Sequence, residues 1–341
     1  MNVRRKGSAA ACVAAFLFLA VAAGGCAPFI NIPGQAVGEP ALDADGFHAA
    51  DGVVLPVRAW LPEGMPVKAA VVALHGFNDY SSFFVSPALY LAENGVASYA
   101  YDQRGFGAAP GRGLWAGTGA MTADLKAFAR LVRARHPGVP IYLLGASMGG
   151  AVVMVAAAEP DPPAADGVIL AAPAVWGRAT MPWYQRFVLW IGAHTLPSAE
   201  ITGRSLKITP SDNIEMLRAL GADPLVGKAT RIDTLWGLVN LMDRALDSAA
   251  RLTMPTLILY GEKDEIIPRR PTRAMLARLP QAAAERRRVA LYPKGYHMLL
   301  RDVGGETAWK DIRAWMTAPA KPLPSGADRQ VKSWLSAKDG D

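Results

Sequence analysis

Short apolar runs of strand character recur along the chain and alternate with segments of helical periodicity. The runs lie at residues 69–74, 96–101, 141–144, 167–171, 256–260 and 288–292. Across residues 120–135, apolar side chains recur at helical spacing, at Met121, Leu125, Phe128 and Val132. Strands that alternate with helices in this way predict an α/β fold, with a mostly parallel central sheet and helices on both faces. Paired segments around Phe47 and Val53–Trp60 predict an antiparallel hairpin at the edge of this sheet.

Residues 175–250 interrupt the alternation of strands and helices. We expect them to form a helical cap, or lid, inserted into a core made of residues 45–174 and 251–317. Within the cap, residues 182–191 are apolar almost all round a helix, and such a helix is buried or faces lipid. Either it lines an acyl pocket and touches a membrane, or it packs as an ordinary helix. On the first interpretation, the candidate substrate-binding residues are Trp183, Phe187 and Trp190.

The first residues of the sequence have the pattern of a targeting segment. Basic residues 4–6 precede an apolar run from Ala9 to Ala23, which is short for a membrane span and suits a signal peptide. The run ends in Ala23-Gly24-Gly25-Cys26, which resembles the lipobox of bacterial lipoproteins, with alanine in place of the usual leucine. We expect residues 1–25 to be removed and Cys26 to carry lipid. An ordinary secretory signal and an uncleaved anchor are the alternatives.

Cysteine usage agrees with lipid attachment. The two cysteines are Cys12 and Cys26, so a chain cleaved before Cys26 forms no internal disulfide. We expect residues 26–44 to be an extended tether and residues 318–341 a mobile tail. The expected location is the cell envelope, on the periplasmic or outer-membrane face. The protein would be secreted if the lipobox is not used.

The clearest chemical signal is Gly145-Ala146-Ser147-Met148-Gly149, which lies between an apolar strand and a buried helical run. A G-x-S-x-G sequence in a strand–turn–helix context is typical of a nucleophile elbow. Glycines on both sides of the serine allow the sharp turn, and the helix N-terminus favours negative charge beside it. A glycine-rich turn with an incidental serine is the alternative interpretation.

A nucleophilic serine needs a base and an acid that orients the base, and in this architecture both follow the serine along the chain. Of the five histidines, His297 is the only one after Ser147 that follows a predicted strand through a short loop. Asp264 follows the strand at 256–260 and is the preferred acid. Glu262 and Glu265 are its local competitors.

Two backbone N–H groups should stabilise the oxyanion. One belongs to Met148, directly after the serine. The other is expected from Phe77, in the loop His75-Gly76-Phe77-Asn78 after the strand at 69–74. His75 could serve as a base, but we favour a role in bracing this loop.

These motifs and their order resemble those of the α/β-hydrolases, and more narrowly the monoglyceride lipase and lysophospholipase branch. The matching segments are His75-Gly76-Phe77, Asp102-Gln103-Arg104-Gly105-Phe106-Gly107, Gly145-Ala146-Ser147-Met148-Gly149-Gly150, Gly261-Glu262-Lys263-Asp264 and Gly295-Tyr296-His297.

The resemblance spans residues 45–317. It implies Ser147 as nucleophile, Asp264 and His297 as its partners, and the N–H groups of Phe77 and Met148 as oxyanion donors. Ala146 stands where this branch often has histidine. Monoacylglycerol or lysophospholipid is the substrate class that the resemblance implies.

Composition adds few other candidates. The net charge of +7 falls to +4 when the three basic residues at 4–6 are removed with the signal, and this modest charge suits an anionic lipid surface. Basic residues do not interleave with aromatic ones as in nucleic-acid binders. Clustered Cys and His are lacking, so we expect no metal and no cofactor. The sequence therefore predicts a serine hydrolase that cleaves carboxylic esters of lipids through an acyl-enzyme. A short-chain esterase or serine aminopeptidase on the same fold is the alternative, and a non-catalytic lipid-binding lipoprotein is a weaker one.

Overall fold

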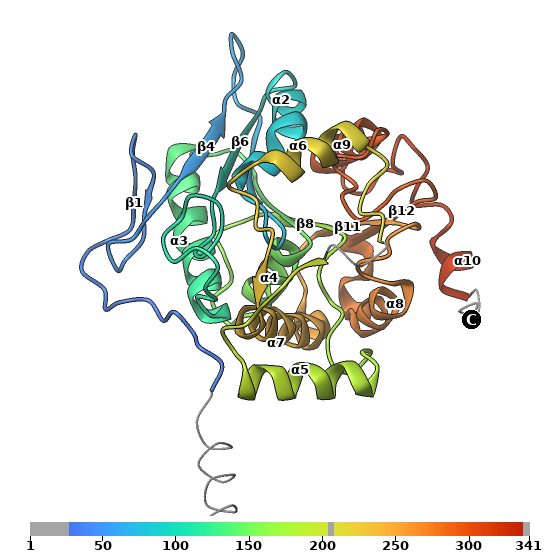
Figure 1. Ribbon diagram of the computed structural model, residues 1–341. Helices are drawn as coiled ribbons and strands as arrows, with labels where there is room; N and C mark the ends of the chain where they lie inside the picture. Colours follow the sequence, from blue (N-terminus) through green and yellow to red (C-terminus); the bar gives the residue numbers. More distant parts are fainter. Residues whose placement is uncertain (1–26, 204–207, 337–341) are drawn as a thin grey trace, which may run out of the picture.

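The computed structural model describes residues 27–203 and 208–336 (Figure 1). Its centre is a 7-stranded sheet in the order β12-β11-β8-β7-β5-β6-β4. Six of these strands are mutually parallel, and β4 at the edge is antiparallel to β6. The strands are β4 (Val57–Trp60), β5 (Ala69–Leu74), β6 (Val96–Tyr101), β7 (Ile141–Ala146), β8 (Gly167–Ala171), β11 (Thr256–Gly261) and β12 (Arg287–Tyr292). The predicted α/β fold is confirmed.

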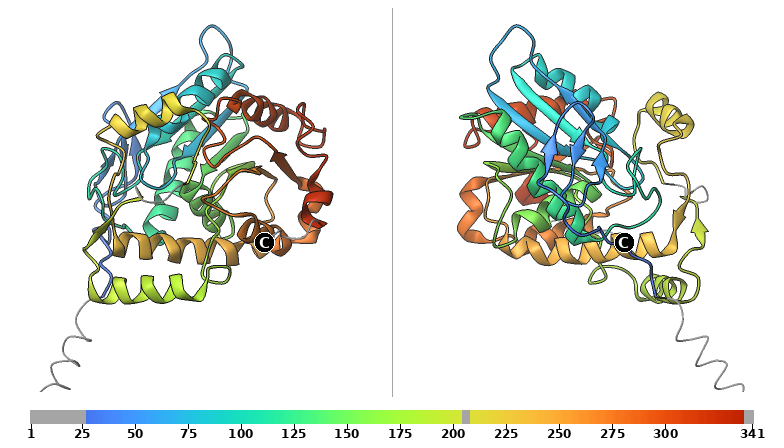
Figure 2. Two further views of the ribbon diagram at one scale, coloured as in Figure 1. Left: turned by 45° about the vertical axis from the view of Figure 1, so that its right-hand side comes forward. Right: turned by 90° about the vertical axis from the view of Figure 1, so that its left-hand side faces the viewer.

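Helices cover both faces of the sheet (Figures 1 and 2). Successive side chains of a strand point to opposite faces, so Val72 belongs to the core on one face and Val71 to the core on the other. The first face is covered by α3 (Thr118–Arg135), α4 (Met148–Ala157), α7 (Ile232–Ser248) and α8 (Arg269–Arg278). The second is covered by α2 (Val85–Ala92) and α9 (Gly305–Thr317). Burial on both faces explains why these strands are continuous apolar runs in the sequence.

The predicted hairpin at the sheet edge is wrong in one respect. Residues of β1 (Ala41–Leu42), β2 (Phe47–His48) and β3 (Val54–Leu55) form a separate 3-stranded antiparallel sheet, and only β4 joins the central one. Pro56 lies between β3 and β4. Because proline has no N–H to donate, it ends one ladder and lets the chain turn into the other.

We expected an extended tether at residues 26–44 and a mobile tail at residues 318–341. The described parts of both segments make contacts with the rest of the molecule. In the predicted tether, Asn31 N donates to Trp115 O at 2.8 Å. In the predicted tail, Leu291 N donates to Ala327 O at 2.9 Å, and the side chains of Leu323 and Trp334 are buried. Burial of two apolar side chains accounts for the difference in the tail, and backbone hydrogen bonds account for it in the tether. The predicted signal peptide and Cys26 lie outside the described residues.

Residues 175–250, the predicted cap, lie between β8 and β11. They form α5 (Trp183–Thr195), α6 (Ile214–Ala222), α7 and a two-stranded ladder of β9 (Glu200–Ile201) and β10 (Thr230–Arg231). Leu241 and Ala245 of α7 are fully buried in the core beside α4. Although it ends the predicted cap, α7 therefore packs in the core, as α3 does.

The remaining short elements are α10 (Val331–Ser336) and the 3-10 helices η1 (Ser81–Phe84), η3 (Ala249–Arg251) and η4 (Gln281–Arg286). Within the part of the chain that the structure describes, no helix has the length and apolar character needed to cross a membrane.

A buried network of ion pairs connects the small sheet to the core. The Arg104 guanidinium donates to both carboxylate oxygens of Asp51 at 2.7 and 2.8 Å, and to those of Asp124 at 2.6 and 3.1 Å. Asp51 lies in the turn between β2 and β3, and Asp124 lies on α3. All three side chains are at most 9% exposed. Removing one partner from such a network leaves buried charge without compensation.

We predict that Arg104→Ala lowers the free energy of unfolding by about 3–5 kcal/mol, because Asp51 and Asp124 lose their shared counter-ion. Urea unfolding followed by circular dichroism measures this loss. The matched control is Arg278→Ala, which breaks an ion pair to Asp247, whose side chain is 74% exposed. That change should lower stability by less than about 1 kcal/mol. Equal losses of stability in the two variants would show that the buried network contributes no more to stability than an exposed ion pair.

Candidate active site

Ser147 lies at the turn between β7 and α4. Its backbone has φ 50° and ψ −114°, a left-handed conformation that is strained for a residue with a side chain. The N–H of Ser147 donates to Ala171 O at 3.0 Å, and the carbonyl of Ser147 accepts from Ala174 N at 2.9 Å. These bonds to the end of β8 hold the serine in its strained turn. The sequence-predicted elbow therefore has the geometry that the motif requires.

The glycines around Ser147 are required by space. A Cβ on Gly145 would lie 2.4 Å from Gly149 O, and a Cβ on Gly149 would lie 2.3 Å from Leu74 O. Both distances are far below contact, and both partners are backbone atoms that cannot rotate away. The strand end and the helix start consequently meet at a separation that side chains would prevent.

His297 and Asp264 form a hydrogen-bonded pair. The Nδ1 of His297 lies 2.8 Å from Asp264 Oδ2, and both side chains are buried. The other oxygen of Asp264 accepts the N–H groups of Ile266 and Ile267, each at 2.9 Å. The carboxylate is therefore fixed on both sides, and it sets the imidazole so that Nδ1 carries the proton and Nε2 is free to accept one.

The two competing acids make other contacts. Glu262 forms an ion pair with Arg269 at 3.7 Å. Glu265 is exposed, and its carboxylate accepts Thr209 N at 2.7 Å. Of the three carboxylates, Asp264 alone is bonded to His297.

Ser147 and His297 line one cavity of about 670 Å³, which lies within the size range of ligand pockets. Among the described residues, the Ser147 hydroxyl has no hydrogen-bond partner. Most of the wall is apolar and comes from the elbow, the loop after β5, α5, α7 and the loop after β11. Its apolar members include Phe77, Phe83, Met181, Leu189, Ile201, Ile208, Leu235, Leu238, Val239, Met242, Ile266 and Met298.

The loop after β5 brings Phe77 to this cavity, as predicted. A Cβ on Gly76 would lie 3.3 Å from Ser147 Cβ, so the loop backbone runs directly against the serine. Met148 is the first residue of α4, and a helix leaves the N–H groups of its first turn without partners in its own backbone. Both candidate oxyanion donors are thus at the serine.

His75 is committed to bracing this loop. Its Nδ1 lies 2.8 Å from Gly76 O and must donate, and its Nε2 lies 2.9 Å from Gln103 N and must accept. The ring is fully buried, and burial lowers the pKa of His75. A neutral imidazole with both nitrogens occupied cannot serve as a base. By holding the Gly76 carbonyl, it sets the peptide plane so that Phe77 N–H points the opposite way.

The predicted substrate-binding residues Trp183, Phe187 and Trp190 do not line the cavity. They are 74%, 55% and 52% exposed, on the outer face of α5. The inner face of the same helix contributes Gln185 and Leu189 instead. The prediction was wrong because a helix that is apolar all round gives no periodicity from which to choose its buried face.

Sequence reasoning also missed the contribution of α7. Leu235, Leu238, Val239 and Met242 line the cavity, and their spacing along the helix was a signal that they share a face. An ion pair between Arg301 and Asp79 belongs to the same wall.

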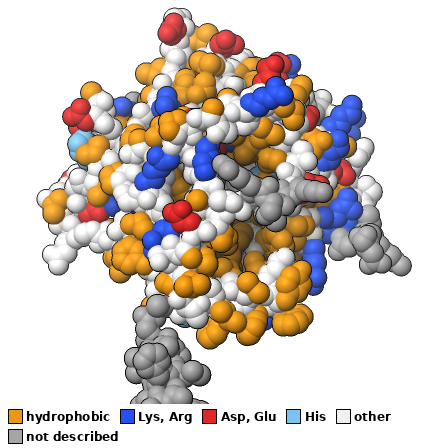
Figure 3. Space-filling view, in the orientation of Figure 1, with side chains coloured by type: hydrophobic (Ala, Val, Ile, Leu, Met, Phe, Trp, Pro, Cys, Tyr) orange, Lys and Arg blue, Asp and Glu red, His pale blue; other side chains and the backbone are white. Residues whose placement is uncertain are grey.

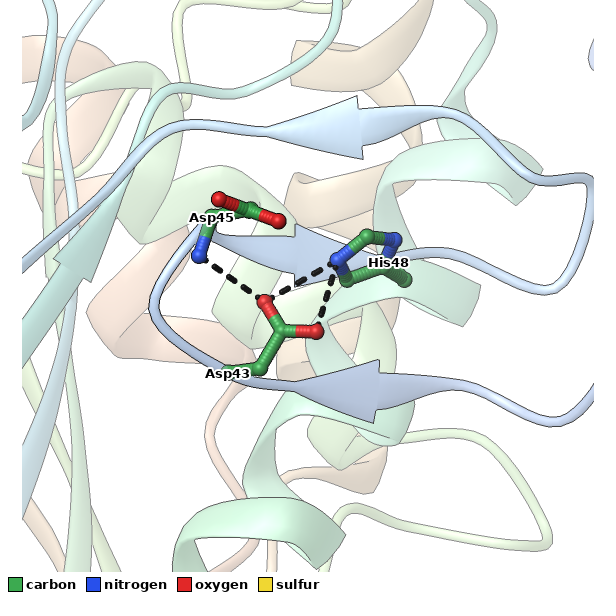
Figure 4. Close-up of side chains that lie close together, drawn as sticks. All are labelled: Asp43, Asp45 and His48. Atoms are coloured by element: carbon green, nitrogen blue, oxygen red, sulfur yellow. Dashed lines mark hydrogen bonds and ion pairs between the residues drawn. The ribbon is translucent and has the colours of Figure 1, made fainter.

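A second cluster of polar side chains lies on the small sheet, where Asp43, Asp45 and His48 come together (Figure 4). The Asp43 carboxylate accepts Asp45 N at 2.9 Å, Gly46 N at 3.3 Å and His48 Nε2 at 3.0 Å. The turn between β1 and β2 explains this cluster, because an aspartate that accepts N–H groups two and three residues ahead stabilises a turn.

The comparisons with known proteins agree with this geometry. Residues 65–304 match the Hydrolase_4 family, described as serine aminopeptidase, S33. The chain belongs to this family. The match spans the elbow, the candidate acid and the candidate histidine of this Hydrolase_4 protein.

Similar proteins place the chain in the monoglyceride lipase-like branch of the α/β-hydrolases. A monoglyceride lipase of Rattus norvegicus is 27% identical, over 84% of this chain and 95% of its own. A monoacylglycerol lipase of Mycolicibacterium smegmatis is 26% identical, over 80% of this chain and 96% of its own. The crystal structure of a soluble variant of monoglyceride lipase from Saccharomyces cerevisiae covers 84% of this chain and 97% of that one, with a TM-score of 0.66 and 21% identity, and supports the fold.

We predict that Gly149→Ala destabilises this Hydrolase_4 protein by about 1–3 kcal/mol or more, because the new methyl group meets the backbone of Leu74. Thermal unfolding followed by circular dichroism tests this prediction. Gly119→Ala is the matched control, since Gly119 lies on exposed helix with open space around it. The control should be neutral or stabilising by up to about 1 kcal/mol. A Gly149→Ala protein as stable as the control would contradict the close approach of α4 to β5.

Proposed function

We propose that this protein is a serine hydrolase that cleaves carboxylic esters of lipids, of the monoacylglycerol or lysophospholipid type, through an acyl-enzyme. One observation carries the proposal: Ser147 and His297 line one apolar cavity, and His297 is hydrogen-bonded to Asp264 behind it. A protein that only bound lipid would need the cavity. It would not need a strained serine, an imidazole oriented by a buried carboxylate, and backbone donors beside the serine.

In the first half of the proposed reaction, His297 Nε2 takes the proton of Ser147 Oγ as that oxygen attacks the ester carbonyl carbon. The carbonyl oxygen becomes negatively charged and is bound by the N–H groups of Phe77 and Met148. Asp264 stabilises the imidazolium through Nδ1–H. The C–O bond to the alcohol then breaks, and His297 gives its proton to the leaving oxygen.

In the second half, water replaces the alcohol. His297 takes a proton from the water as it attacks the acyl carbon, the oxyanion forms again at the same donors, and the bond to Ser147 Oγ breaks. The serine recovers its proton from His297, and the fatty acid leaves. Each half passes one proton through the same imidazole, which explains why one well-oriented histidine is sufficient.

The wall of the cavity favours a long acyl chain. Each methylene removed from water contributes about 0.8 kcal/mol, so an apolar wall gains most from a fatty acyl group. The names of the relatives point the same way, since both curated relatives above are lipases of monoacylglycerols. A short-chain esterase would use only a small part of this wall.

The outer face of α5 supports action at a bilayer. Trp183, Phe187 and Trp190 project into solvent there, and Figure 3 shows hydrophobic side chains gathered at the lower edge of the molecule, over α5. The described chain begins beside one end of this helix in Figures 1 and 2, and Ile32 near that start is 77% exposed.

We therefore propose that α5 and the start of the described chain rest on one lipid surface. A lipid on Cys26, or the apolar run from Ala9 to Ala23, would hold the chain at that surface. Tryptophan and other amphipathic aromatic residues favour the interface between lipid and water. Under this proposal, the protein works at a membrane of the cell envelope.

We predict that Ser147→Ala lowers ester turnover by at least about four orders of magnitude and abolishes labelling by a fluorophosphonate probe, with the fold unchanged. Hydrolysis of a long-chain monoacylglycerol, followed as release of fatty acid, provides the measurement. The control Ser198→Ala removes an exposed serine of the insertion and should behave as wild type.

Substantial hydrolysis by a folded Ser147→Ala protein would overturn the mechanism. The substrate class is decided on the same wild-type protein with an acetyl ester and an aminoacyl amide in parallel. A higher rate on the acetyl ester would favour a short-chain esterase, and a higher rate on the amide would favour an aminopeptidase.

We predict that the combined change Trp183→Ser, Phe187→Ser and Trp190→Ser lowers hydrolysis of long-chain monoacylglycerol in anionic phospholipid vesicles by at least about tenfold. Each aromatic side chain that enters the interface contributes about 1.5 kcal/mol or more. Hydrolysis of a soluble acetyl ester should stay within about twofold, because none of the three residues lines the cavity.

The control is Leu89→Ser, which removes an apolar side chain of similar exposure from α2, on the opposite side of the molecule (Figures 1 and 2). If the triple variant hydrolyses vesicle substrate as well as this control does, α5 does not contact the bilayer. Equal losses of activity on both substrates would indicate that the aromatic residues of α5 are needed for folding instead.

A further inference from the structure

The backbone on both sides of His297 is held by hydrogen bonds. Directly after it, Met298 N donates to Pro210 O at 2.9 Å. Directly before it, Tyr296 N donates to Asp302 Oδ2 at 2.7 Å. Pro210 belongs to the insertion between β8 and β11, so one of these bonds reaches the histidine loop from outside the core.

The second bond also leads back to the insertion. The Ser211 hydroxyl donates to Asp302 Oδ1 at 2.6 Å, and both residues are buried, with Ser211 completely inaccessible. Burial raises the pKa of the Asp302 carboxyl, because a carboxylate inside the protein lacks the water that would stabilise its charge. The Ser211 hydroxyl and the Tyr296 N–H replace that water, one on each oxygen. Asp302 therefore connects Ser211 to the backbone of Tyr296, the residue that precedes His297.

The same segment contacts the loop of the candidate acid. Thr209 N donates to the carboxylate of Glu265, the residue after Asp264, at 2.7 Å. Residues 209–211, which we name the strap, thus touch both loops that carry the imidazole and its orienting carboxylate. Directly after the strap, Asp212 accepts Val303 N at 2.9 Å, and Asn213 donates to Arg301 O at 3.0 Å.

We propose that the strap positions the imidazole of His297, and that Ser211 and Asp302 are positioning residues for the reaction at Ser147. This inference rests on the proposed function and deepens it, since it makes the insertion part of the catalytic geometry as well as a cover for the cavity. A base must lie within hydrogen-bond reach of the proton it takes. Asp264 fixes the direction of the ring, and the strap fixes the main chain from which the ring extends.

The test is Ser211→Ala in the full chain, with a soluble acetyl ester as substrate. We expect kcat to fall by about tenfold or more, because small displacements of a catalytic group have effects of this size. KM should stay within about twofold, since Ser211 does not line the cavity. Rescue is tested at the partner residue: Asp302→Asn keeps an oxygen for Tyr296 N–H and an amide for the Ser211 oxygen. It should therefore lose less kcat than Asp302→Leu.

The matched control is Asp212→Ala, at the residue directly after the strap. It also removes a hydrogen bond to the histidine loop, but the bond is exposed and ends at Val303, beyond the residues that flank His297. We expect its kcat to stay within about twofold of wild type. If Asp212→Ala and Ser211→Ala lose activity equally, the strap contributes general packing and the proposal is overturned.

A second measurement separates this inference from the proposed function. In protein labelled with ¹⁵N-histidine, NMR reports how fast the His297 Nδ1 proton exchanges with water. We expect faster exchange in Ser211→Ala than in wild type and Asp212→Ala, at equal distance below each thermal unfolding midpoint. If wild type hydrolyses no ester, the proposed function fails, and the exchange rate still decides whether the strap positions the ring. Unchanged exchange in a folded Ser211→Ala protein would overturn the proposal.

Discussion

The close approach of β7, β5 and α4 at Ser147 is the constraint on which the site depends. It exists because Gly145, Gly149 and Gly76 have no side chains where backbone atoms or the serine itself lie against them. The strained conformation of Ser147 follows from this approach, and so does the position of the loop after β5 beside it. Sheet order then completes the site. Because β11 and β12 follow β8 in the parallel sheet, the loops after these strands open at the same edge as the elbow.

The parts of the fold that are determined by neighbouring residues could be predicted from the sequence. Strands buried on both faces are continuous apolar runs, so most of their bounds were recovered to within one or two residues. The order serine, acid, histidine selected His297 because few histidines were available. The orientation of α5 and the packing of Trp334 could not be predicted in the same way, because both depend on which distant surface is left for an apolar segment to cover. The strap escaped notice for another reason: two of its bonds, from Thr209 N and to Pro210 O, are made by its backbone, which any residue supplies.

The insertion has apolar surface on two sides, and the two sides have different uses. Leu189 of α5 faces inward, to the cavity, with the α7 side chains, whereas Trp183 and Trp190 face outward. An apolar lipid must leave one apolar environment and enter another without a long exposure to water. A helix that presents such a surface to the bilayer and another to the cavity shortens that exposure. Under the proposed function, this single helix links the lipid surface to the site of the reaction.

Two buried carboxylates serve the same histidine in different ways. Asp264 is bonded to the ring nitrogen, where in the proposed mechanism its charge stabilises the imidazolium directly. Asp302 is bonded to the main chain before the ring and to a hydroxyl of the insertion. Burial of this second carboxylate is unfavourable by itself, so its retention inside the protein depends on the donors around it. Displacing the strap would remove one of these donors and one of the two bonds that flank His297 together. The geometry of the base is therefore tied to the placement of the insertion.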